Sequence, residues 1–366
     1  MKAQILKENL AKALSVAGRV VSTRGSLEIL SHVLLSTEKG RLRVSATNLE
    51  IGINYWVGGK IEKEGDITIP ARLFIDVVNS ISSEKIDLSV EDLNVRVKSE
   101  NDNLVIKGIS AEEFPVIPTI QGTPSFTIKA SILKDALNLV NFAAAIEESR
   151  PVLSGIYFNL DGDKLTIAAT DSYRLAEYVL KLEKKAEQKI EIIVPARTMI
   201  ELSRVIADLD EEIKVFINDN QILFSAKDIE FTSRLIEGQF PDYKQIIPKD
   251  NETKAVLQSS EFTNALKVAS LFARESANSI NLVVKPKGEV EIKAISAQIG
   301  ESDTVIKADV EGKEGEITFN SKYLLDVLNS LKVKAVTLEI SGKLSPGVIR
   351  VENGPEYVYI IMPLRS

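Results

Sequence analysis

An internal repeat constrains this chain more than any other feature, because the same short landmark introduces a helical pattern three times. The landmark occupies residues 69–72 (IPAR), 194–197 (VPAR) and 319–322 (FNSK), so successive copies are 125 residues apart. After each copy, apolar residues recur with the i, i+3, i+4, i+7 spacing of an amphipathic helix. A fixed period of this kind indicates tandem copies of one supersecondary unit.

Other segments recur with a similar period and define the content of the unit. Residues 46–49 (ATNL) and 169–172 (ATDS) each follow an alternating segment, LRVSAT and LTIAAT, which predicts a strand; the third copy, IKAIS, is degenerate. A second amphipathic helix is predicted upstream in every unit, in the segments LKENLAKALSVAGRVV, ILKDALNLVNFAAAI and FTNALKVASLFAR. Two helices and many short strands in each unit predict an α+β fold, repeated three times.

Two Phe-Pro segments mark the expected joints between the units. Residues 114–123 (FPVIPTIQGT) and 240–249 (FPDYKQIIPK) each contain a second Pro, and we expect extended connections there. The predicted domains are therefore residues 1–120, 121–248 and 249–366. A chain of 366 residues is long for a single core, which agrees with this division.

The composition excludes several classes of chemistry. The chain has no Cys and a single His, His32, so disulfides, thiol nucleophiles, Cys-containing zinc sites and most His-dependent catalysis are ruled out. It contains no GxxxxGK[ST], GxGxxG or HExxH motif, and we expect no cofactor and no metal. No apolar run approaches the roughly 18 residues that a membrane helix requires, so we expect a soluble cytoplasmic protein.

The charge is acidic overall but evenly supplied with basic residues. Lys and Arg number 45 against 52 Asp and Glu, and each predicted domain has 15 basic residues against 16, 20 and 16 acidic ones. A net charge of -7 argues against a uniformly basic coat for nucleic acid. Arg72, Arg197 and Lys322, however, hold the same position in the three copies, where a basic helix face would suit phosphates; helix capping or ion pairing explains the pattern equally well.

Three stretches, together with FNSKYLLDVLNSL, carry a family resemblance over essentially the whole chain. They are ATDSYRLAEY (169–178), FTSRLIEGQFPDYKQIIPK (231–249) and YIIMPLRS (359–366). In these motifs and their order the chain resembles the bacterial DNA polymerase III beta subunit family, the sliding clamps. The resemblance implies a head-to-tail ring of two chains, with helices around the hole and sheets outside, through which duplex DNA passes. It also implies a non-enzymatic processivity factor that tethers the replicative polymerase.

The resemblance implies three sets of site residues. The DNA-facing set is Arg24, Arg72, Arg150 and Arg197, and the dimer interface is Leu104 and Ile106 of one chain against Leu271 and Phe272 of the other. A pocket for short linear peptides is implied at Leu153, Thr170, Ser172, Tyr173, Arg174, Leu175, Pro241, Ile246, Asn320, Tyr323, Met362, Pro363, Leu364 and Arg365. Leu, Ile, Met and Pro would supply an apolar floor, while Thr170, Asn320 and Arg365 would hydrogen-bond an extended backbone.

The implied partners follow from these sites. They are duplex DNA without sequence preference, a second copy of the chain, the DNA polymerase III alpha subunit, the clamp loader, and other polymerases and repair proteins that carry clamp-binding peptides. The implied location is the bacterial cytoplasm, with association to the nucleoid during replication, and no membrane partner is expected.

Two other classes of protein stay open from the residues alone. One is an enzyme built from repeated α/β units, like the enolpyruvyl transferases; Asp161 and Asp163 are its candidate metal ligands, although an Asp-Gly-Asp hairpin turn is the commoner explanation. The other is a peptide-binding scaffold that does not embrace DNA. Measured turnover would favour the first, and failure to stay on closed circular DNA would favour the second.

Overall fold

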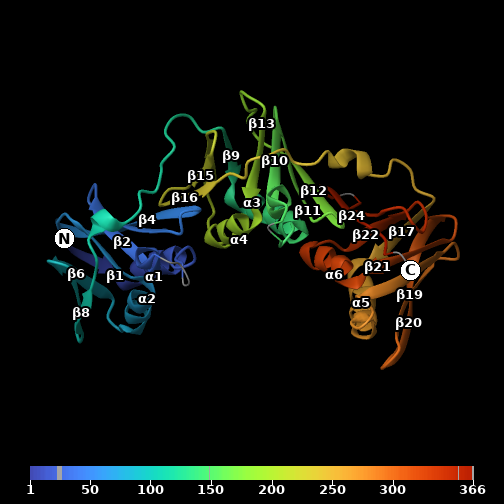
Figure 1. Ribbon diagram of the computed structural model, residues 1–366, viewed down its shortest axis with the longest axis horizontal. Helices are drawn as coiled ribbons and strands as arrows, with labels where there is room; N and C mark the ends of the chain where they lie inside the picture. The colour runs from blue at the N-terminus through green and yellow to red at the C-terminus, as the bar shows by residue number, and fades with distance from the viewer. Residues whose placement is uncertain (23–26, 148, 353, 365–366) are drawn as a thin grey trace. The chain divides into compact units, whose positions relative to one another are not determined.

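A computed structural model describes residues 1–22, 27–147, 149–352 and 354–364 (Figure 1). The chain forms two compact units, Met1–Ser131 with Glu201–Leu235, and Ile132–Ile200 with Ile236–Ser366. Each unit is organised around one twelve-stranded sheet of the described residues. Helices and sheets together make the fold α+β, as predicted.

The first unit contains the N-terminal repeat and four strands from the second, β9, β14, β15 and β16. Its elements are β1(Lys2–Leu6), α1(Lys7–Ala17), η1(Glu28–Ser31), β2(His32–Glu38), β3(Arg41–Thr47), β4(Ile51–Lys63), β5(Asp66–Pro70), α2(Ala71–Ser80), β6(Lys85–Glu91), β7(Asn94–Lys98), β8(Asn103–Lys107), η2(Ala111–Glu113), β9(Phe126–Lys129), β14(Glu212–Ile217), β15(Gln221–Ser225) and β16(Ile229–Arg234). The sheet runs β8-β7-β6-β1-β4-β16-β15-β14-β9, and β2, β3 and β5 join it through β4.

The second unit contains the rest of the second repeat and all of the third. Its elements are η3(Asn141–Ala143), η4(Pro151–Ser154), β10(Gly155–Asp161), β11(Lys164–Thr170), β12(Arg174–Lys181), β13(Ile190–Pro195), η5(Tyr243–Ile246), β17(Thr253–Gln258), α5(Ser259–Ala273), β18(Ser279–Lys285), β19(Glu289–Ser296), β20(Gly300–Gly312), β21(Gly315–Asn320), α6(Ser321–Ser330), β22(Ala335–Ile340), β23(Gly347–Arg350) and β24(Glu356–Ile361). The strand order is β13-β10-β11-β12-β24-β23-β22-β17-β20-β19-β18-β21.

The helices follow the apolar spacing of the sequence. Helix α1 buries Leu10, Ala13, Leu14 and Ala17, an i, i+3, i+4, i+7 stripe. It packs on α2 and on the sheet strands β3 and β4, while α5 packs on α6 and on β18, β19 and β20 (Figure 1). Each pair of helices therefore covers one face of a sheet, because only one stripe of each helix is apolar.

The predicted repeat is present in the fold. Helices α2, α4(Ala196–Val205) and α6 start 125 residues apart, each directly after a strand. The upstream helices of the three repeats are α1, α3(Ala130–Val140) and α5. Two of the boundaries between the compact units fall inside helices, one in α3 and one in α4. The compact units therefore do not coincide with the repeats, and the domain limits at 120 and 248 stay a prediction.

The second joint differs from the extended segment that we expected. Residues 114–123 contain no helix or strand, whereas residues 243–246 form the single 3-10 turn η5. The reason is local packing, because Tyr243 at the start of this turn is 5% exposed and must point into the core. Pro241 accepts a hydrogen bond from the Tyr243 N–H at 2.8 Å, which closes the turn onto the Phe-Pro pair.

Two further findings bear on the sequence predictions. Asp161 and Lys164 face each other at the end of the β10–β11 hairpin, with Gly162 at φ +60°, so the Asp-Gly-Asp segment is a tight turn. None of the helices in the described part of the chain is long and apolar enough to cross a membrane.

Candidate functional site

The candidate site is built on the sharp turn between β11 and β12, from Thr170 to Arg174. The Thr170 hydroxyl donates to the carbonyl oxygen of Arg174 at 2.7 Å and accepts from the Ser172 N–H at 3.2 Å. The Asp171 carboxylate accepts from the N–H groups of Tyr173 (2.9 Å) and Arg174 (3.0 Å). These four hydrogen bonds hold the backbone of the turn in place, and the Tyr173 side chain is left 64% exposed.

Arg174 ties this turn to the helix of the third repeat. Its guanidinium donates to Asp171 at 2.9 Å and to Asp326 of α6 at 2.5 Å. The guanidinium carbon lies 4.4 Å from the ring centroid of Tyr323 and 5.6 Å from that of Phe142. The side chain is only 8% exposed, so two carboxylates and two aromatic faces replace the water around this cation.

The electrostatics of the cluster keep Arg174 charged. Burial alone would lower the pKa of the Arg174 guanidinium, but Tyr359, Asp326 and Asp171 outweigh it and raise that pKa above its ordinary value. Burial also raises the pKa of the Tyr323 hydroxyl, with a further contribution from Asp171. The phenol therefore stays neutral at pH 7 and presents its ring, not a charge, at the surface beside the turn.

The end of the chain runs beside the same turn. Strand β24 pairs with β12 so that Ile361 faces Arg174, and the next residue, Met362, donates its N–H to the Tyr173 carbonyl oxygen at 2.8 Å. Two residues on, the Leu364 N–H donates to the Thr318 carbonyl oxygen of β21 at 2.8 Å. The tail is thus held by backbone bonds on both sides of Pro363, while the Met362 side chain remains 37% exposed.

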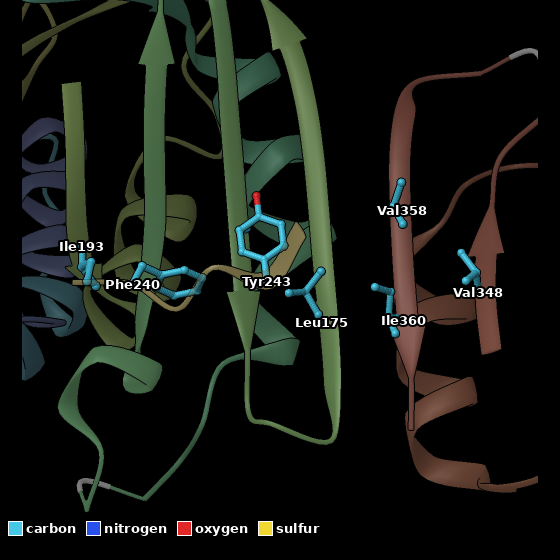
Figure 2. Packing of buried hydrophobic residues seen from close by; sticks show 8 residues of the cluster. Leu175, Ile193, Phe240, Tyr243, Val348, Val358 and Ile360 are labelled. Carbon is cyan, nitrogen blue, oxygen red and sulfur yellow. The ribbon is translucent and has the colours of Figure 1, made fainter. Parts of the chain in front are cut away.

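A hydrophobic cluster beneath the site fixes the Phe-Pro joint to both β12 and β24 (Figure 2). Phe240 and Tyr243 from the joint pack in one cluster with Leu175, Val358 and Ile360. The Phe240 ring also stacks on Tyr157, with centroids 4.8 Å apart. Because the cluster buries these side chains, the neighbouring residues of the joint are turned outward.

A buried hydrogen bond strengthens this attachment. The Tyr243 hydroxyl donates to the carboxylate of Glu177 on β12, a group that is 9% exposed. Burial and this bond raise the pKa of the Tyr243 hydroxyl above its ordinary value. The tyrosine therefore remains a hydrogen-bond donor at neutral pH. Pro241 and Ile246, which flank it in the chain, are exposed beside the cluster.

The structure brings together six of the fourteen predicted pocket residues through direct contacts. Thr170, Ser172, Tyr173 and Arg174 form the turn, Arg174 contacts Tyr323, and the tail at Met362 bonds to the turn. Leu153 and Leu175 are only 5% and 1% exposed, so they support the surface from below rather than form it. Asn320 uses its side-chain oxygen to cap α6, accepting from the Lys322 N–H at 2.9 Å. Arg365 lies outside the described residues.

Sequence reasoning missed the residues that hold Arg174. Asp326 and Phe142 contact it directly, and the Tyr359 hydroxyl donates to the Tyr323 carbonyl oxygen at 3.0 Å. Asp326 lies one helical turn after Tyr323, so the repeat could have suggested that both face the same neighbour. Phe142 gave no signal, because an aromatic residue in an apolar helix pattern is indistinguishable from ordinary core.

The predicted DNA-facing residues occupy different settings. Arg72 and Arg197 are each the second residue of their helix, α2 and α4, and both are exposed. Arg150 is exposed and donates to the Ser172 hydroxyl at 3.4 Å, so it adjoins the candidate site. Arg24 lies outside the described residues.

The predicted dimer residues lie on an edge strand and on a helix. Leu104 and Ile106 share a face of β8, as predicted, and the two differ in burial: Ile106 is 6% exposed and pairs with buried Val95, whereas Leu104 is 38% exposed. Val105 on the opposite face is 55% exposed, and sequence analysis did not select it. On α5, Leu271 is 50% exposed and Phe272 is partly buried.

The described residues offer little for catalysis by a metal. No group of three or more His, Asp or Glu residues is arranged to hold a metal ion in the part of the chain that the structure describes. The acidic residues nearest the candidate turn, Asp171 and Asp326, are both engaged by Arg174. This surface exposes the apolar side chains of Tyr173, Ile246 and Met362.

Comparison with protein families accounts for almost the whole chain. Residues 1–118 match the DNA polymerase III beta subunit, N-terminal domain; residues 127–242 match its central domain, and residues 244–365 match its C-terminal domain. The beta sliding clamp of Bacillus subtilis is 30% identical over 377 aligned residues, which cover 100% of both chains.

Solved structures agree with this match. A Bacillus subtilis DNA polymerase sliding clamp superposes with a TM-score of 0.96 at 30% identity, covering 100% of this chain and 99% of that one. The DNA polymerase III subunit beta of Pseudomonas aeruginosa gives a TM-score of 0.94 at 28% identity and full coverage of both chains.

The fold and the site define a sliding clamp, made of three clamp domains in tandem. The chain belongs to the DNA polymerase III beta subunit family. Its homologues, the beta sliding clamps, act as non-catalytic processivity factors of DNA polymerase. The hypothesis that the chain is an enzyme is therefore set aside.

Proposed function

We propose that two copies of this chain close head to tail into a ring that encircles duplex DNA, and that the surface around Tyr173 and Met362 binds linear peptides of replication and repair proteins. The proposal gives this chain the role of its homologues, a DNA polymerase processivity factor. Its finer partners are the DNA polymerase III alpha subunit, a clamp loader, and other polymerases and repair proteins, and its place of action is the cytoplasm.

The observation that carries the peptide site is the attachment of the chain's tail to the Thr170–Arg174 turn. Backbone bonds at Met362 and Leu364 and the buried Arg174 hold the surrounding backbone in place before any ligand arrives. Exposed apolar side chains, including Tyr173 at 64% and Ile246 at 45%, then stand on a rigid support. Such preorganisation lowers the entropic cost of binding a flexible peptide.

Ring closure is supported by two open strand edges. β8 is the first strand of its sheet and pairs only with β7 in the described chain, and residues 300–307 of β20 pair only with β19. Val105 on the first edge is 55% exposed and Val305 on the second is 52% exposed. Unpaired edges with exposed apolar residues favour pairing between chains, and a head-to-tail contact closes after two copies when its rotation allows.

The peptide site is tested by fluorescence anisotropy with a labelled peptide that contains Gln-Leu-Ser-Leu-Phe. We expect saturable binding that Met362→Ala weakens by about tenfold, because the variant removes an exposed anchor contact. Leu73→Ala is the matched control, since Leu73 is also half exposed but lies on α2 in the other unit. Equal binding by the wild type and the Met362 variant would remove the tail from the site.

The ring is tested by retention on DNA. After loading by a clamp loader with ATP, the protein should stay on a closed circular duplex through gel filtration and leave it once the circle is cut. Loss of the protein from the intact circle, or its retention on the linear form, would instead favour a peptide-binding scaffold that does not embrace DNA. Light scattering should give twice the chain mass of 40.3 kDa.

A further inference from the structure

The first unit contains a hollow that no prediction from the sequence used. Its cavity volume is about 100 Å³, and three segments line it: Thr47 and residues 49–52 at the β3–β4 turn, residues 115–118 of the first Phe-Pro joint, and residues 232–234 at the end of β16, together with Gln221. All of these residues belong to the same compact unit.

The turn beside this hollow has the same hydrogen bonds as the Thr170–Arg174 turn. The Thr47 hydroxyl donates to the Ile51 carbonyl oxygen at 2.8 Å and accepts from the Leu49 N–H at 3.0 Å. The Asn48 side-chain oxygen accepts from the N–H groups of Glu50 and Ile51, as Asp171 does in the other turn. Leu49 has a φ of +76°, the value found at Ser172.

The strand and the joint around the turn also correspond. The Arg234 N–H donates to the Glu50 carbonyl oxygen at 3.0 Å, which matches the bond from Met362 to Tyr173. Pro115 follows Phe114 as Pro241 follows Phe240, and Phe114 is likewise buried, at 7% exposure. The repeat has therefore produced, in the first unit, the same backbone frame that we propose for peptide binding in the second.

The side chains on this frame give the hollow a mixed lining, with aliphatic groups from Leu49, Ile51, Val116 and Ile117 and polar groups from Thr47, Gln221, Thr232 and Ser233. Ile51 stands where the other site has Arg174, so this turn has no buried cation and no stacked aromatic rings. Gly52 makes room for Ile117, because a Cβ on Gly52 would lie 2.5 Å from the Ile117 Cγ2 atom. An enclosed cavity of roughly 150 Å³ accepts benzene, and this open hollow of about 100 Å³ is smaller, so we expect it to favour one aliphatic side chain over an aromatic ring.

Apolar and charged groups surround the opening. Val116 is 89% exposed and Leu49 is 46% exposed, so two aliphatic side chains stand without cover at the hollow. Glu50 and Arg234 are both exposed, and neither forms an ion pair with another residue of the described chain. One free charge of each sign at an apolar opening fits a peptide backbone with polar flanking residues better than a strongly charged ligand.

We propose that this hollow is a second peptide-binding site, which takes one Leu, Ile or Val side chain of an extended segment from a partner protein. The analogy rests on the peptide site proposed above, but the hollow lies in the other unit and has its own lining. A partner with two anchors would gain affinity from both sites without any new type of contact, because the second anchor binds at a high effective concentration.

The test uses two small probes, acetyl-Ser-Leu-Ser-amide and its Phe counterpart, titrated into full-length protein with ¹³C-labelled Ile methyl groups. The Leu probe should give saturable shifts of the Ile51 and Ile117 signals, and the Phe probe should bind about tenfold more weakly. Leu49→Asn keeps a residue that tolerates a positive φ and removes the apolar wall, so it should weaken the Leu probe by about tenfold.

Two further variants separate this site from the proposed tail site. Met362→Ala should leave the Ile51 and Ile117 shifts unchanged, and Ile117→Ala should enlarge the hollow and improve binding of the Phe probe. Absence of saturable shifts at Ile51 and Ile117, or equal affinities for the wild type and Leu49→Asn, overturns the inference. If the Ile shifts are absent but Met362→Ala weakens binding of the fluorescent peptide, only the second site fails. If the Ile shifts persist but Met362→Ala leaves binding of the fluorescent peptide unchanged, only the first site fails.

Discussion

The guanidinium carbon of Arg174 lies 4.4 Å from the ring centroid of Tyr323, and the same guanidinium binds both Asp171 and Asp326. One side chain thus joins a turn of the second repeat to a helix of the third. Without it, the partly buried carboxylates of Asp171 and Asp326, 15% and 28% exposed, would lose the cation that both bind, so the arginine determines whether Tyr323 keeps its place.

Arg174→Met tests this relationship. Removal of one partner from a buried ion pair leaves uncompensated charge, so the free energy of unfolding should fall by about 3 kcal/mol, and peptide binding should weaken with it. Urea unfolding followed by circular dichroism gives the first quantity, and anisotropy gives the second.

Arg204→Met is the matched control. The arginine of its pair with Glu201 has 54% of its side chain accessible, and loss of this pair should lower the free energy of unfolding by under about 1 kcal/mol. Similar losses in the two variants would contradict the role of Arg174.

The repeat and the helices were predictable because they depend on local pattern. Apolar spacing placed α2, α4 and α6, and the alternating segments before Asn48 and Asp171 placed β3 and β11. These features repeat every 125 residues, so each copy supported the prediction of the others. The hairpin at Gly162 was predictable for the same reason, since Asp-Gly turns are recognised from two residues.

The partners of the site residues were not predictable in this way. Which aromatic ring covers Arg174 depends on how η3 and α6 pack, and no short pattern encodes a contact between residues 142 and 174 or between 174 and 326. The burial of Leu175 also escaped the sequence, because a Leu beside a turn reads equally well as a surface anchor and as core. The η5 turn was missed because Tyr243 was treated as part of an extended joint rather than as the donor to Glu177.

Gly347 offers a test of packing under the tail strand. A Cβ at this position in β23 would lie 2.3 Å from the Cζ atom of Phe319, a fully buried ring, so Gly347→Ala should reduce the free energy of unfolding by about 2 kcal/mol. Gly58→Ala in β4 meets no atom within 4 Å and should change stability by less than about 0.5 kcal/mol. Thermal unfolding of both proteins measures the difference, and a neutral Gly347 variant would show that Phe319 can move.

His32 predicts a dependence of stability on pH. The side chain is 3% exposed, and its Nδ1 atom lies 3.3 Å from the Thr68 hydroxyl oxygen. Burial lowers the pKa of His32 below its ordinary value of 6.5, and nearby Glu28 opposes this only in part. The unfolded chain therefore takes up a proton at a higher pH than the folded chain, so the contribution to stability is present above pH 6.5 and is lost as the pH falls through the folded pKa.

The measurement is the midpoint of thermal unfolding between pH 7.5 and pH 5. His32→Asn keeps a short polar side chain near Thr68 but does not titrate, so its midpoint should fall less steeply over this range than that of the wild type. Parallel curves would mean that His32 titrates alike in the folded and unfolded chains, and that the acid sensitivity comes from other groups.

The open edge at β8 predicts how the proposed dimer can be broken. Val105 projects from the outer face of that strand with 55% of its surface exposed, and its strand neighbour Arg96 is the only residue across from it in the described sheet. A carboxylate placed there would lose its water when a partner edge covers it, a cost that the neighbouring Arg96 offsets only in part, so Val105→Asp should weaken association by about 10- to 100-fold, the equivalent of roughly 1.4 to 2.8 kcal/mol. Leu344→Asp is the control, because Leu344 is 77% exposed in the turn between β22 and β23 and away from either open edge.

Sedimentation velocity over a range of concentrations should show the Val105 variant at the chain mass where the wild type and the control remain dimeric. A dimeric Val105 variant with unchanged affinity would move the interface away from β8, and the ring would then have to close through other surfaces.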